Sequence, residues 1–379
     1  MPVSNSIGTI AAIPLVDLRA SHAEVNEEIR AGLDRALEDA AFIKGEEVEG
    51  FEREYASFTG VRHCVGVANG TDALELALRA AGVPTGSEVL LPANTFVATA
   101  EAVVRAGARP VLADVDPDCL LLTADSLSDA GPGLAAVMPV HLYGQMAPMT
   151  SIVAAARQRS VLVIEDAAQA HGATQDGSPA GSFGLMAGVS FYPGKNLGAY
   201  GDAGAVLTQS PEMARSIRLL GDHGSERKYE HLSVGFNSRL DALQALVLRV
   251  RLRRLAQWNA ARREAALRYE ELLSGLDEIS LPKTLPGNEH VWHLYVIRVP
   301  QRDRILQDLN ENGVRAAIHY PVPVHLQPAF RYLGYAPGDF PVAEAAAGQI
   351  LSLPLYPQIT LEQQQRVAQA IRSALRDRP

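Results

Sequence analysis

The chain has 379 residues, of which 47% are hydrophobic and 20% charged, and its formal net charge is −9. This length is enough for two or three domains with a sizeable core, and the acidic balance argues against a general nucleic-acid binder. The two cysteines, Cys64 and Cys119, form neither a disulfide framework nor a metal-ligand cluster, so we expect no metal site and a reducing compartment.

The first apolar run, Ile7 to Val16, does not have the pattern of a signal peptide. It lacks a basic start, contains Pro14 and leads into an acidic segment. Nothing elsewhere in the sequence reaches the length of a membrane helix. We therefore expect a cytoplasmic protein with no membrane partner.

The first half of the chain alternates between helical and strand-like patterns. Residues 23–40 have helical spacing, and a strong helix is predicted over Asp72–Ala81. Short apolar runs predict strands at Cys64–Val67, Glu88–Leu91, Pro110–Ala113, Ala135–His141, Val161–Glu165, Gly188–Phe191 and Ala203–Thr208. Strands that alternate with helices predict an α/β fold with a largely parallel sheet covered on both faces.

The second half has a different character. After Gly235-Phe236-Asn237 a long helical pattern runs to about Leu276. Further elements are predicted as a strand at Trp292–Arg298, a helix at Arg302–Asn312, a strand at Val314–Ile318, a Pro-rich connection at Tyr320–Phe330 and a last helix with a Thr360/Gln363 capping box. We predict a large domain at 1–255 and a smaller C-terminal α+β domain at 256–379. This prediction leaves open that the N-terminal segment packs on the small domain.

Lys195 lies in a turn broken by Gly and Pro, directly after the strand predicted at Gly188–Phe191. Such a backbone can approach a ligand closely, and open α/β sheets bind ligands at the carboxyl ends of their strands. A phosphate-binding P-loop does not fit, because Gly188 and Gly194 enclose five residues and Asn196 follows the lysine. The alternative is an ordinary solvated lysine. Our hypothesis is that Lys195 forms a Schiff base with pyridoxal phosphate.

Pyridoxal phosphate needs an acid at its pyridine nitrogen, and Asp166 is the candidate. It closes the apolar run Val161–Ile164, where an unpaired buried carboxylate would be costly. The alternative for Asp166 is an N-cap of the segment that follows.

The cofactor also needs a phosphate site and a flat side chain against its ring. Gly70 and Thr71 join a strand to a helix N-terminus, which suits a phosphate but also suits a simple capped turn. Ser190 offers a further hydroxyl, and Asn237 offers an amide unless it only caps the long helix. Phe96 either stacks on the ring or belongs to the core.

The order and spacing of five segments resemble the DegT/DnrJ/EryC1/StrS family of PLP-dependent sugar aminotransferases. The resemblance runs from about Pro14 to Pro357 and is carried by Asn69-Gly70-Thr71-Asp72-Ala73-Leu74, Pro92 to Thr99, Glu165-Asp166-Ala167-Ala168-Gln169-Ala170-His171-Gly172, Ser190 to Gly198, and Gly235 to Asp241. It implies the fold-type-I aminotransferase architecture and a homodimer with active sites at the subunit interface.

The resemblance also implies roles for single residues. Lys195 and Asp166 become the catalytic pair, and Gln169 lies near the ring 3-oxygen. The remaining cofactor contacts are the phosphate ligands Gly70, Thr71 and Ser190, the stacking ring Phe96, and Asn237, which reaches the phosphate in the neighbouring subunit. Contacts to a nucleotide-sugar are implied for Tyr192, His319 and Tyr320. The alternative for His319-Tyr320-Pro321 is a strand end fixed by proline.

The implied reaction moves an amino group from L-glutamate to a nucleotide-linked keto sugar. One branch of the family has histidine in place of the lysine and performs dehydration, so Lys195 favours transamination. The residues around Lys195 look like those of members that aminate C3, which favours a dTDP-3-keto-6-deoxyhexose giving the 3-amino-3,6-dideoxyhexose. The alternatives are a 4-keto or UDP-linked sugar, or a non-catalytic PLP-binding regulator.

Overall fold

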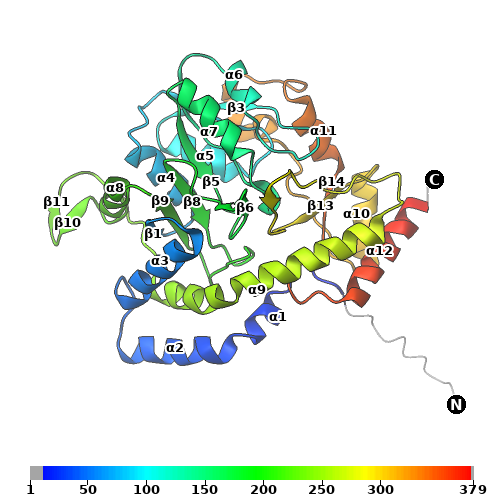
Figure 1. Cartoon of the computed structure of the whole chain (residues 1–379), viewed down its shortest axis with the longest axis horizontal. Coiled ribbons are helices and arrows are strands. Elements are labelled where there is room, and N and C mark those ends of the chain that lie inside the picture. Colours follow the sequence, from blue (N-terminus) through cyan, green and yellow to red (C-terminus); the bar gives the residue numbers. More distant parts are fainter. Residues whose placement is uncertain (1–11, 377–379) are drawn as a thin grey trace.

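The computed structural model of the protein describes residues 12–376 (Figure 1). The start of the apolar run Ile7–Val16 and the outer ends of the two predicted domains, 1–11 and 377–379, lie outside the described residues. Within 12–376, no helix combines the length and the apolar character that crossing a membrane requires.

A seven-stranded sheet forms the centre of the large part of the molecule. Its strands follow the order β1-β9-β8-β5-β4-β2-β3. Their bounds are β1 His63–Val67, β2 Glu88–Pro92, β3 Arg109–Ala113, β4 Leu134–Val137, β5 Leu162–Asp166, β8 Met186–Ser190 and β9 Gly204–Thr208. β9 runs antiparallel to β1 and β8, and the other neighbours are parallel. The predicted α/β fold with a mostly parallel sheet is confirmed. The strand predicted over Ala135–His141 is shorter, because Pro139 has no N–H with which to continue a ladder.

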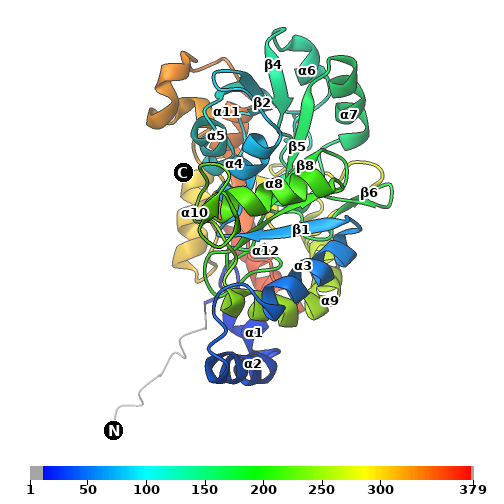
Figure 2. The same cartoon turned by 90° about the vertical axis from the view of Figure 1, so that its left-hand side faces the viewer.

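Helices cover both faces of this sheet, as Figures 1 and 2 show. They are α3 Glu46–Thr59, α4 Gly70–Ala80, α5 Val97–Arg105, α6 Asp125–Asp129, α7 Met149–Gln158 and α8 Pro211–Gly221. Val89 and Leu91 of β2 belong to the core beneath α4 and α5, whereas Leu90 belongs to the core beneath α7. The residues Val89–Leu91 are continuously apolar because both faces of the strand are buried there.

The 32-residue helix α9, Ala242–Leu273, connects the two parts of the molecule. In Figure 1 it runs along the lower edge from α3 to α12, Leu361–Arg376, with α1 Leu18–Ala23 and α2 Asn26–Glu38 beneath its first half. The boundary predicted near residue 255 falls inside this single helix and stays a prediction.

The C-terminal part has its own core. β13 Tyr295–Arg298 pairs antiparallel with β14 Ile350–Leu353, and α10 Arg302–Glu311 packs beside α12. The N-terminal segment joins this core. Ile13 is buried in it and bridges to Val314, and the Leu355 N–H donates to the Leu15 carbonyl at 3.1 Å.

The capping box predicted before the last helix is confirmed. The Thr360 N–H donates to Gln363 Oε1 at 2.9 Å, and the Gln363 N–H donates to Thr360 Oγ1 at 3.1 Å. These reciprocal bonds satisfy two donors that the start of α12 would otherwise leave unpaired.

The strand predicted over Val314–Ile318 is wrong. Val314 and Ala317 make only isolated bridges, because the Ala316 N–H bonds back to the Val314 carbonyl at 3.1 Å and turns the chain between them. The segment beyond residue 318 packs against the large part of the molecule. It contains η2 Val324–Leu326, η3 Pro328–Leu333 and α11 Pro341–Gln349, and Val324, Phe330 and Phe340 pack into the core of the large sheet.

The remaining elements are short. They are η1 Leu142–Gly144, β6 Thr174–Gln175, β7 Ser178–Pro179 and β12 Asn288–Glu289, with β10 Ser225–Arg227 and β11 Glu230–His231 forming a hairpin that projects from the large part in Figure 1.

We expect the substitution Gly204→Ala to destabilise the protein. A Cβ at Gly204 would lie 2.4 Å from the carbonyl carbon and oxygen of Asn69. These are backbone atoms, which cannot move away as the end of a flexible side chain can. The expected loss is about 1–3 kcal/mol in the free energy of unfolding, measured by chemical denaturation. Gly348→Ala is the control, since α11 has open space there; it should leave stability unchanged or raise it. Equal stability of the two variants would contradict this packing.

Candidate active site

A pocket of about 660 Å³ opens where β5 and β8 end. Ten of the eleven predicted site residues line it: Gly70, Thr71, Phe96, Asp166, Gln169, Ser190, Tyr192, Lys195, His319 and Tyr320. Asp166 is the last residue of β5, and Ser190 is the last residue of β8. Because these neighbouring strands are parallel, their carboxyl ends meet at one edge of the sheet.

Asp166 presents a buried carboxylate to this pocket. Its Oδ2 accepts a hydrogen bond from Thr99 Oγ1 at 2.8 Å, and its Oδ1 accepts one from the Ala168 N–H at 3.1 Å. Burial raises the pKa of Asp166, while the bonds from Thr99 and Ala168 and the charge of Lys195 oppose that rise. Both sequence interpretations therefore describe part of the geometry. One oxygen caps the following turn, and the carboxylate as a whole is suited to a partner that shares a proton with it.

Lys195 is partly buried on the same side of the sheet. Burial lowers the pKa of its amine to about 8, against the attraction of Asp166. The turn that carries it closes by a bond from the Lys195 N–H to the Tyr192 carbonyl at 2.9 Å. Gly198 is required there, since a Cβ would lie 2.3 Å from the Pro193 carbonyl oxygen. An amine with this pKa serves as a nucleophile and base near neutral pH, which does not fit a solvated loop lysine.

The N-terminus of α4 faces the same pocket. Asn69 caps the helix, accepting from the Asp72 N–H at 2.8 Å, and the next residues, Gly70 and Thr71, line the pocket. A Cβ at Gly70 would lie 2.6 Å from Cβ of Ser190, so the turn and the end of β8 are in close contact. The first N–H groups of a helix have no intrahelical acceptor and favour an anion. The capped turn and the anion site are thus compatible.

Gln169 connects the large part to the segment after residue 318. Its Oε1 accepts from the Tyr143 N–H at 2.6 Å, and its Nε2 donates to the Tyr320 hydroxyl at 3.1 Å. The hydroxyl of Tyr143 donates to the His319 carbonyl at 2.5 Å. Burial, followed by the charge of Lys195, lowers the pKa of His319 to about 4, so its imidazole is neutral at neutral pH.

Two aromatic side chains stand at the mouth of the pocket. Phe96 is 50% exposed and Tyr192 is 59% exposed. The Phe96 ring lies 5.2 Å from the ring of Tyr320. The alternative that Phe96 is a core residue is wrong, and its open face is available to a planar ligand.

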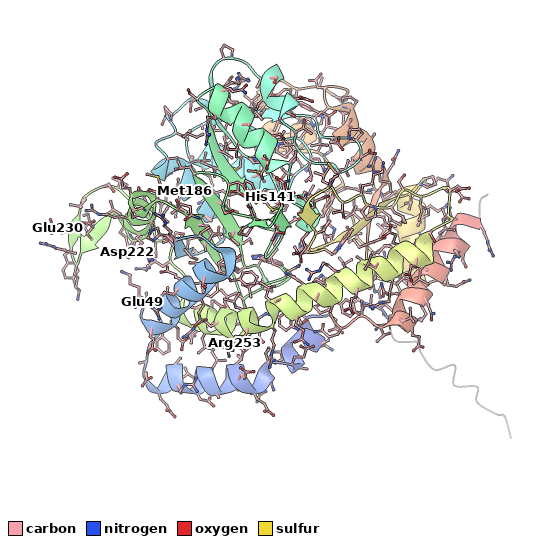
Figure 3. All side chains as sticks on the ribbon, in the orientation of Figure 1. Glu49, His141, Met186, Asp222, Glu230 and Arg253 are labelled. Carbon is pink, nitrogen blue, oxygen red and sulfur yellow. The ribbon has the colours of Figure 1, made fainter. Side chains whose placement is uncertain are left out.

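Asn237 is not among the residues that line this pocket. Its Oδ1 accepts from Arg239 Nη2 at 2.7 Å, and its backbone bridges to Asp222. The alternative that Asn237 caps the long helix is wrong, because Asp241 holds that position. In Figure 3 Asp222, the bridging partner of Asn237, lies at the base of the segment that carries Glu230 outward. The predicted place of Asn237 in a neighbouring subunit stays a prediction.

The sequence did not point to several residues of the pocket. Thr99 supports Asp166, and Thr95 supports Thr99 by a hydroxyl contact of 2.8 Å. Their spacing of four residues across the start of α5 was a usable signal, since such residues share a helix face. His293 also lines the pocket and has a pKa held well below its usual value, first by burial and then by Lys195. Nothing in the sequence around His293 indicated this.

The arrangement can hold a particular kind of group. A buried acid, an amine with a lowered pKa and a helix N-terminus suit a ligand with a basic ring nitrogen, a carbonyl and an anion. The close contact between Gly70 and Ser190 leaves no room for a side chain at position 70, so this position offers only its backbone to an anion. These features fit pyridoxal phosphate.

The profile of the DegT/DnrJ/EryC1/StrS aminotransferase family matches residues 23–372. The chain belongs to this family.

Named relatives extend over nearly the whole chain. A UDP-N-acetyl-3-dehydro-alpha-D-glucosamine 3-aminotransferase of Acidithiobacillus ferrooxidans is 46% identical, covering 96% of this chain and 98% of the relative. A dTDP-3-amino-3,4,6-trideoxy-alpha-D-glucose transaminase of Streptomyces venezuelae is 44% identical, covering 95% of both. A "pleiotropic regulatory protein" of Geobacillus stearothermophilus is 43% identical, covering 95% of this chain and 97% of the relative.

A solved structure agrees with this assignment. The crystal structure of S. venezuelae DesV in complex with a ketimine intermediate superposes with a TM-score of 0.95 at 42% identity. The superposition covers 98% of this chain and all of DesV (100%). The aminotransferase fold predicted from the sequence is confirmed.

We expect the Lys195 amine of the cofactor-free protein to titrate near pH 8, well below the ordinary lysine value of 10.5. Reductive methylation at a series of pH values, followed by peptide mass spectrometry, would show the labelling of Lys195 rising with pH and levelling off above about 8. Asp166→Asn should lower the midpoint, because the carboxylate favours the charged ammonium. A midpoint near 10.5 would contradict the burial of this amine.

Proposed function

We propose that the protein is a pyridoxal-phosphate-dependent aminotransferase that moves an amino group from L-glutamate to a nucleotide-linked keto sugar. The observation that carries the proposal is the meeting of Lys195, Asp166 and the start of α4 at one pocket. When bound, pyridoxal phosphate carries the amino group between substrates and acts as the electron sink for the carbon that loses its proton.

Three groups of residues are suited to hold the cofactor. Asp166 holds a proton on the ring nitrogen, since its raised pKa favours sharing that proton. The N–H groups of Gly70 and Thr71, with the hydroxyls of Thr71 and Ser190, bind the phosphate. Phe96 covers one face of the ring. Gln169 lines the same pocket and contacts the 3-oxygen.

Lys195 binds the cofactor and moves the proton. A pKa of about 8 leaves a useful fraction of neutral amine near neutral pH, and proton transfer is most efficient when the base titrates close to the working pH. The same amine returns the proton in the second half of the cycle, so we expect ping-pong kinetics.

The rest of the pocket is suited to a large polar substrate. A volume of about 660 Å³ accommodates more than the cofactor. Tyr192 at the mouth, with neutral His319 and the hydroxyl of Tyr320, offers hydrogen bonds and a stacking face to a nucleotide-sugar. The two transaminase relatives are named for 3-amino and 3-dehydro sugars, which supports amination at C3. We propose a dTDP-3-keto-6-deoxyhexose as the substrate, and a UDP-linked sugar as the alternative.

A non-catalytic regulator is the second candidate, because one relative is named as a regulatory protein. The presence of both Lys195 and Asp166 favours an enzyme, since a protein that only binds a cofactor has no need of a base with a lowered pKa. We further propose a homodimer in which Asn237 reaches the phosphate in the other subunit, and a cytoplasmic location as expected from the sequence.

Replacement of the lysine tests the reaction. Lys195→Ala should lower turnover by at least about 10²–10⁴-fold, the range that a positioned acid–base group contributes, and should abolish the borohydride-trappable cofactor. Lys283→Ala is the control, because Lys283 is 65% exposed and pairs with Asp118 outside the pocket. Full multiple-turnover activity of Lys195→Ala would overturn the proposal.

A substrate panel tests the specificity. The protein is incubated with glutamate and dTDP- or UDP-linked 3-keto and 4-keto sugars, and the position of the new amine is read by NMR. We expect amination at C3 with the dTDP sugar preferred. Amination at C4 would overturn the regiochemistry, and no product with any sugar would favour the regulator.

A further inference from the structure

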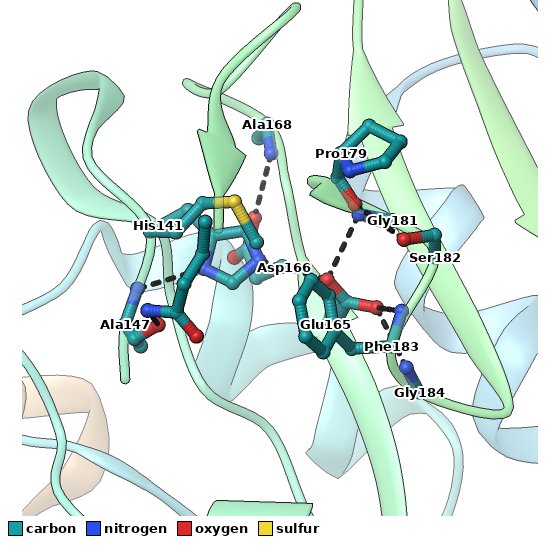
Figure 4. Close-up of polar contacts among 12 residues, drawn as sticks. His141, Ala147, Glu165, Asp166, Ala168, Pro179, Gly181, Ser182, Phe183 and Gly184 are labelled. Carbon is teal, nitrogen blue, oxygen red and sulfur yellow. Dashed lines mark hydrogen bonds and ion pairs between the residues drawn. The ribbon is translucent and has the colours of Figure 1, made fainter. Parts of the chain in front are cut away.

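Glu165, next to Asp166 on β5, is the most completely bonded carboxylate that the described residues contain near the site. It is 0% exposed. Its Oε2 accepts from His141 Nε2 at 2.9 Å and the Gly181 N–H at 2.8 Å, and its Oε1 accepts from the Phe183 N–H at 2.9 Å and the Gly184 N–H at 2.7 Å. Figure 4 shows this carboxylate against the loop 181–184. We call Glu165 and its four donors the Glu165 cluster.

The bonds of His141 fix its tautomer. Its Nδ1 accepts from the Ala147 N–H at 3.2 Å, so the ring hydrogen is on Nε2 and is donated to Glu165. The same residue holds the neighbouring acid through the backbone, since the His141 N–H donates to the Asp166 carbonyl at 3.0 Å. The Asp166 N–H in turn donates to the Pro139 carbonyl at 2.9 Å. The short segment 139–141 therefore bonds to both acids. It holds Glu165 through the His141 side chain and Asp166 through the backbone.

The loop 181–184 leads directly into the strand that carries the lysine turn. β8 begins at Met186 and ends at Ser190. Its later residues are held to β5 by the register Asp166↔Gly188 and by a bond from the Ala167 N–H to the Gly188 carbonyl at 2.9 Å. The loop that precedes β8 is held by three backbone N–H groups, of Gly181, Phe183 and Gly184, which donate to Glu165. The Glu165 cluster thus joins the strand bearing Asp166 to the strand leading to Lys195.

Successive residues of a strand point to opposite faces. Asp166 faces the pocket with Thr99, and Glu165 faces the interior on the other side. A sideways shift of β5 would move the Asp166 carboxylate relative to the pocket, and the Glu165 cluster opposes such a shift from the face that the ligand never touches.

We propose that Glu165 is a positioning residue that holds Asp166 in place against the ring nitrogen of the cofactor, with His141 as its supporting donor. The inference rests on the proposed function, because Asp166 needs a fixed position only if it serves that nitrogen. Glu165 itself touches neither cofactor nor substrate.

The test uses the pH titration of the absorption band of pyridoxal phosphate bound to Lys195. A proton held on the ring nitrogen by Asp166 disfavours a second proton at the lysine linkage. Asp166→Asn should therefore move the midpoint upward. Glu165→Gln keeps the size of the side chain but places an NH₂ group against two N–H donors. It should move the midpoint in the same direction by a smaller amount and lower turnover by about 100-fold, as expected for a catalytic group displaced by about an ångström.

The matched control is Glu344→Gln. His325 Nε2 contacts Glu344 Oε1 at 2.9 Å, and Glu344 also accepts the N–H groups of Gly338 and Phe340, so the same kind of cluster exists outside the pocket. This variant should leave the midpoint unchanged. A second readout is the dissociation constant of pyridoxamine phosphate for the cofactor-free protein, measured by calorimetry, which should rise in Glu165→Gln and stay at the wild-type value in the control.

A pair of substitutions at His141 covers the case in which Glu165→Gln does not fold. His141→Asn removes the donor to Glu165 and should move the midpoint upward, whereas His141→Gln can restore an N–H near the Nε2 position and should return it toward the wild-type value. If the Glu165 and His141 variants lower thermal stability but keep the wild-type midpoint and affinity, the positioning role is wrong. If Asp166→Asn also leaves the midpoint in place, the proposed function itself fails.

Discussion

The parallel pairing of β5 with β8 is the constraint on which the site depends. Asp166 lies opposite Gly188 in this register, and the two strands end at the same edge of the sheet. The acid is therefore delivered by one strand end, and Ser190 and the lysine turn by its neighbour. Helix α4 brings its N-terminus to the same edge, where Gly70 meets Ser190 closely enough to exclude a side chain. Three distant segments become one pocket because the sheet aligns their ends.

The electrostatics of the pocket follow from this burial. Removal from water raises the pKa of Asp166 and lowers that of Lys195, so each charge is costly alone. Their mutual attraction opposes both shifts and limits them. The nearby imidazoles of His171, His293 and His319 all have lowered pKa values, which keeps them uncharged beside the amine. The pocket is thereby prepared for a ligand that brings a proton-sharing nitrogen and a carbonyl.

The two parts of the molecule meet around this pocket. His319 and Tyr320 come from beyond the long helix α9, yet they bond to Tyr143 and Gln169 of the large part. The N-terminal segment also takes part, since Leu15 and Val16 line the same pocket. A substrate that bridges these segments would contact side chains from both ends of the chain, which suits a ligand with separate nucleotide and sugar portions.

Local sequence patterns were enough to predict the repeating order of strands and helices, the lysine turn and the acid at the end of a buried strand. Apolar period, turn residues and capping boxes are local, so the sheet strands and the start of α12 were predictable from nearby residues. Contacts between residues that are far apart in the chain became visible only in the folded structure. It placed Thr99 on Asp166, His293 beside the pocket and four donors around Glu165, and it bent the chain at Ala316 where a strand was predicted. Those contacts depend on which strand ends and loops become neighbours, and spacing along one chain carries no record of that pairing.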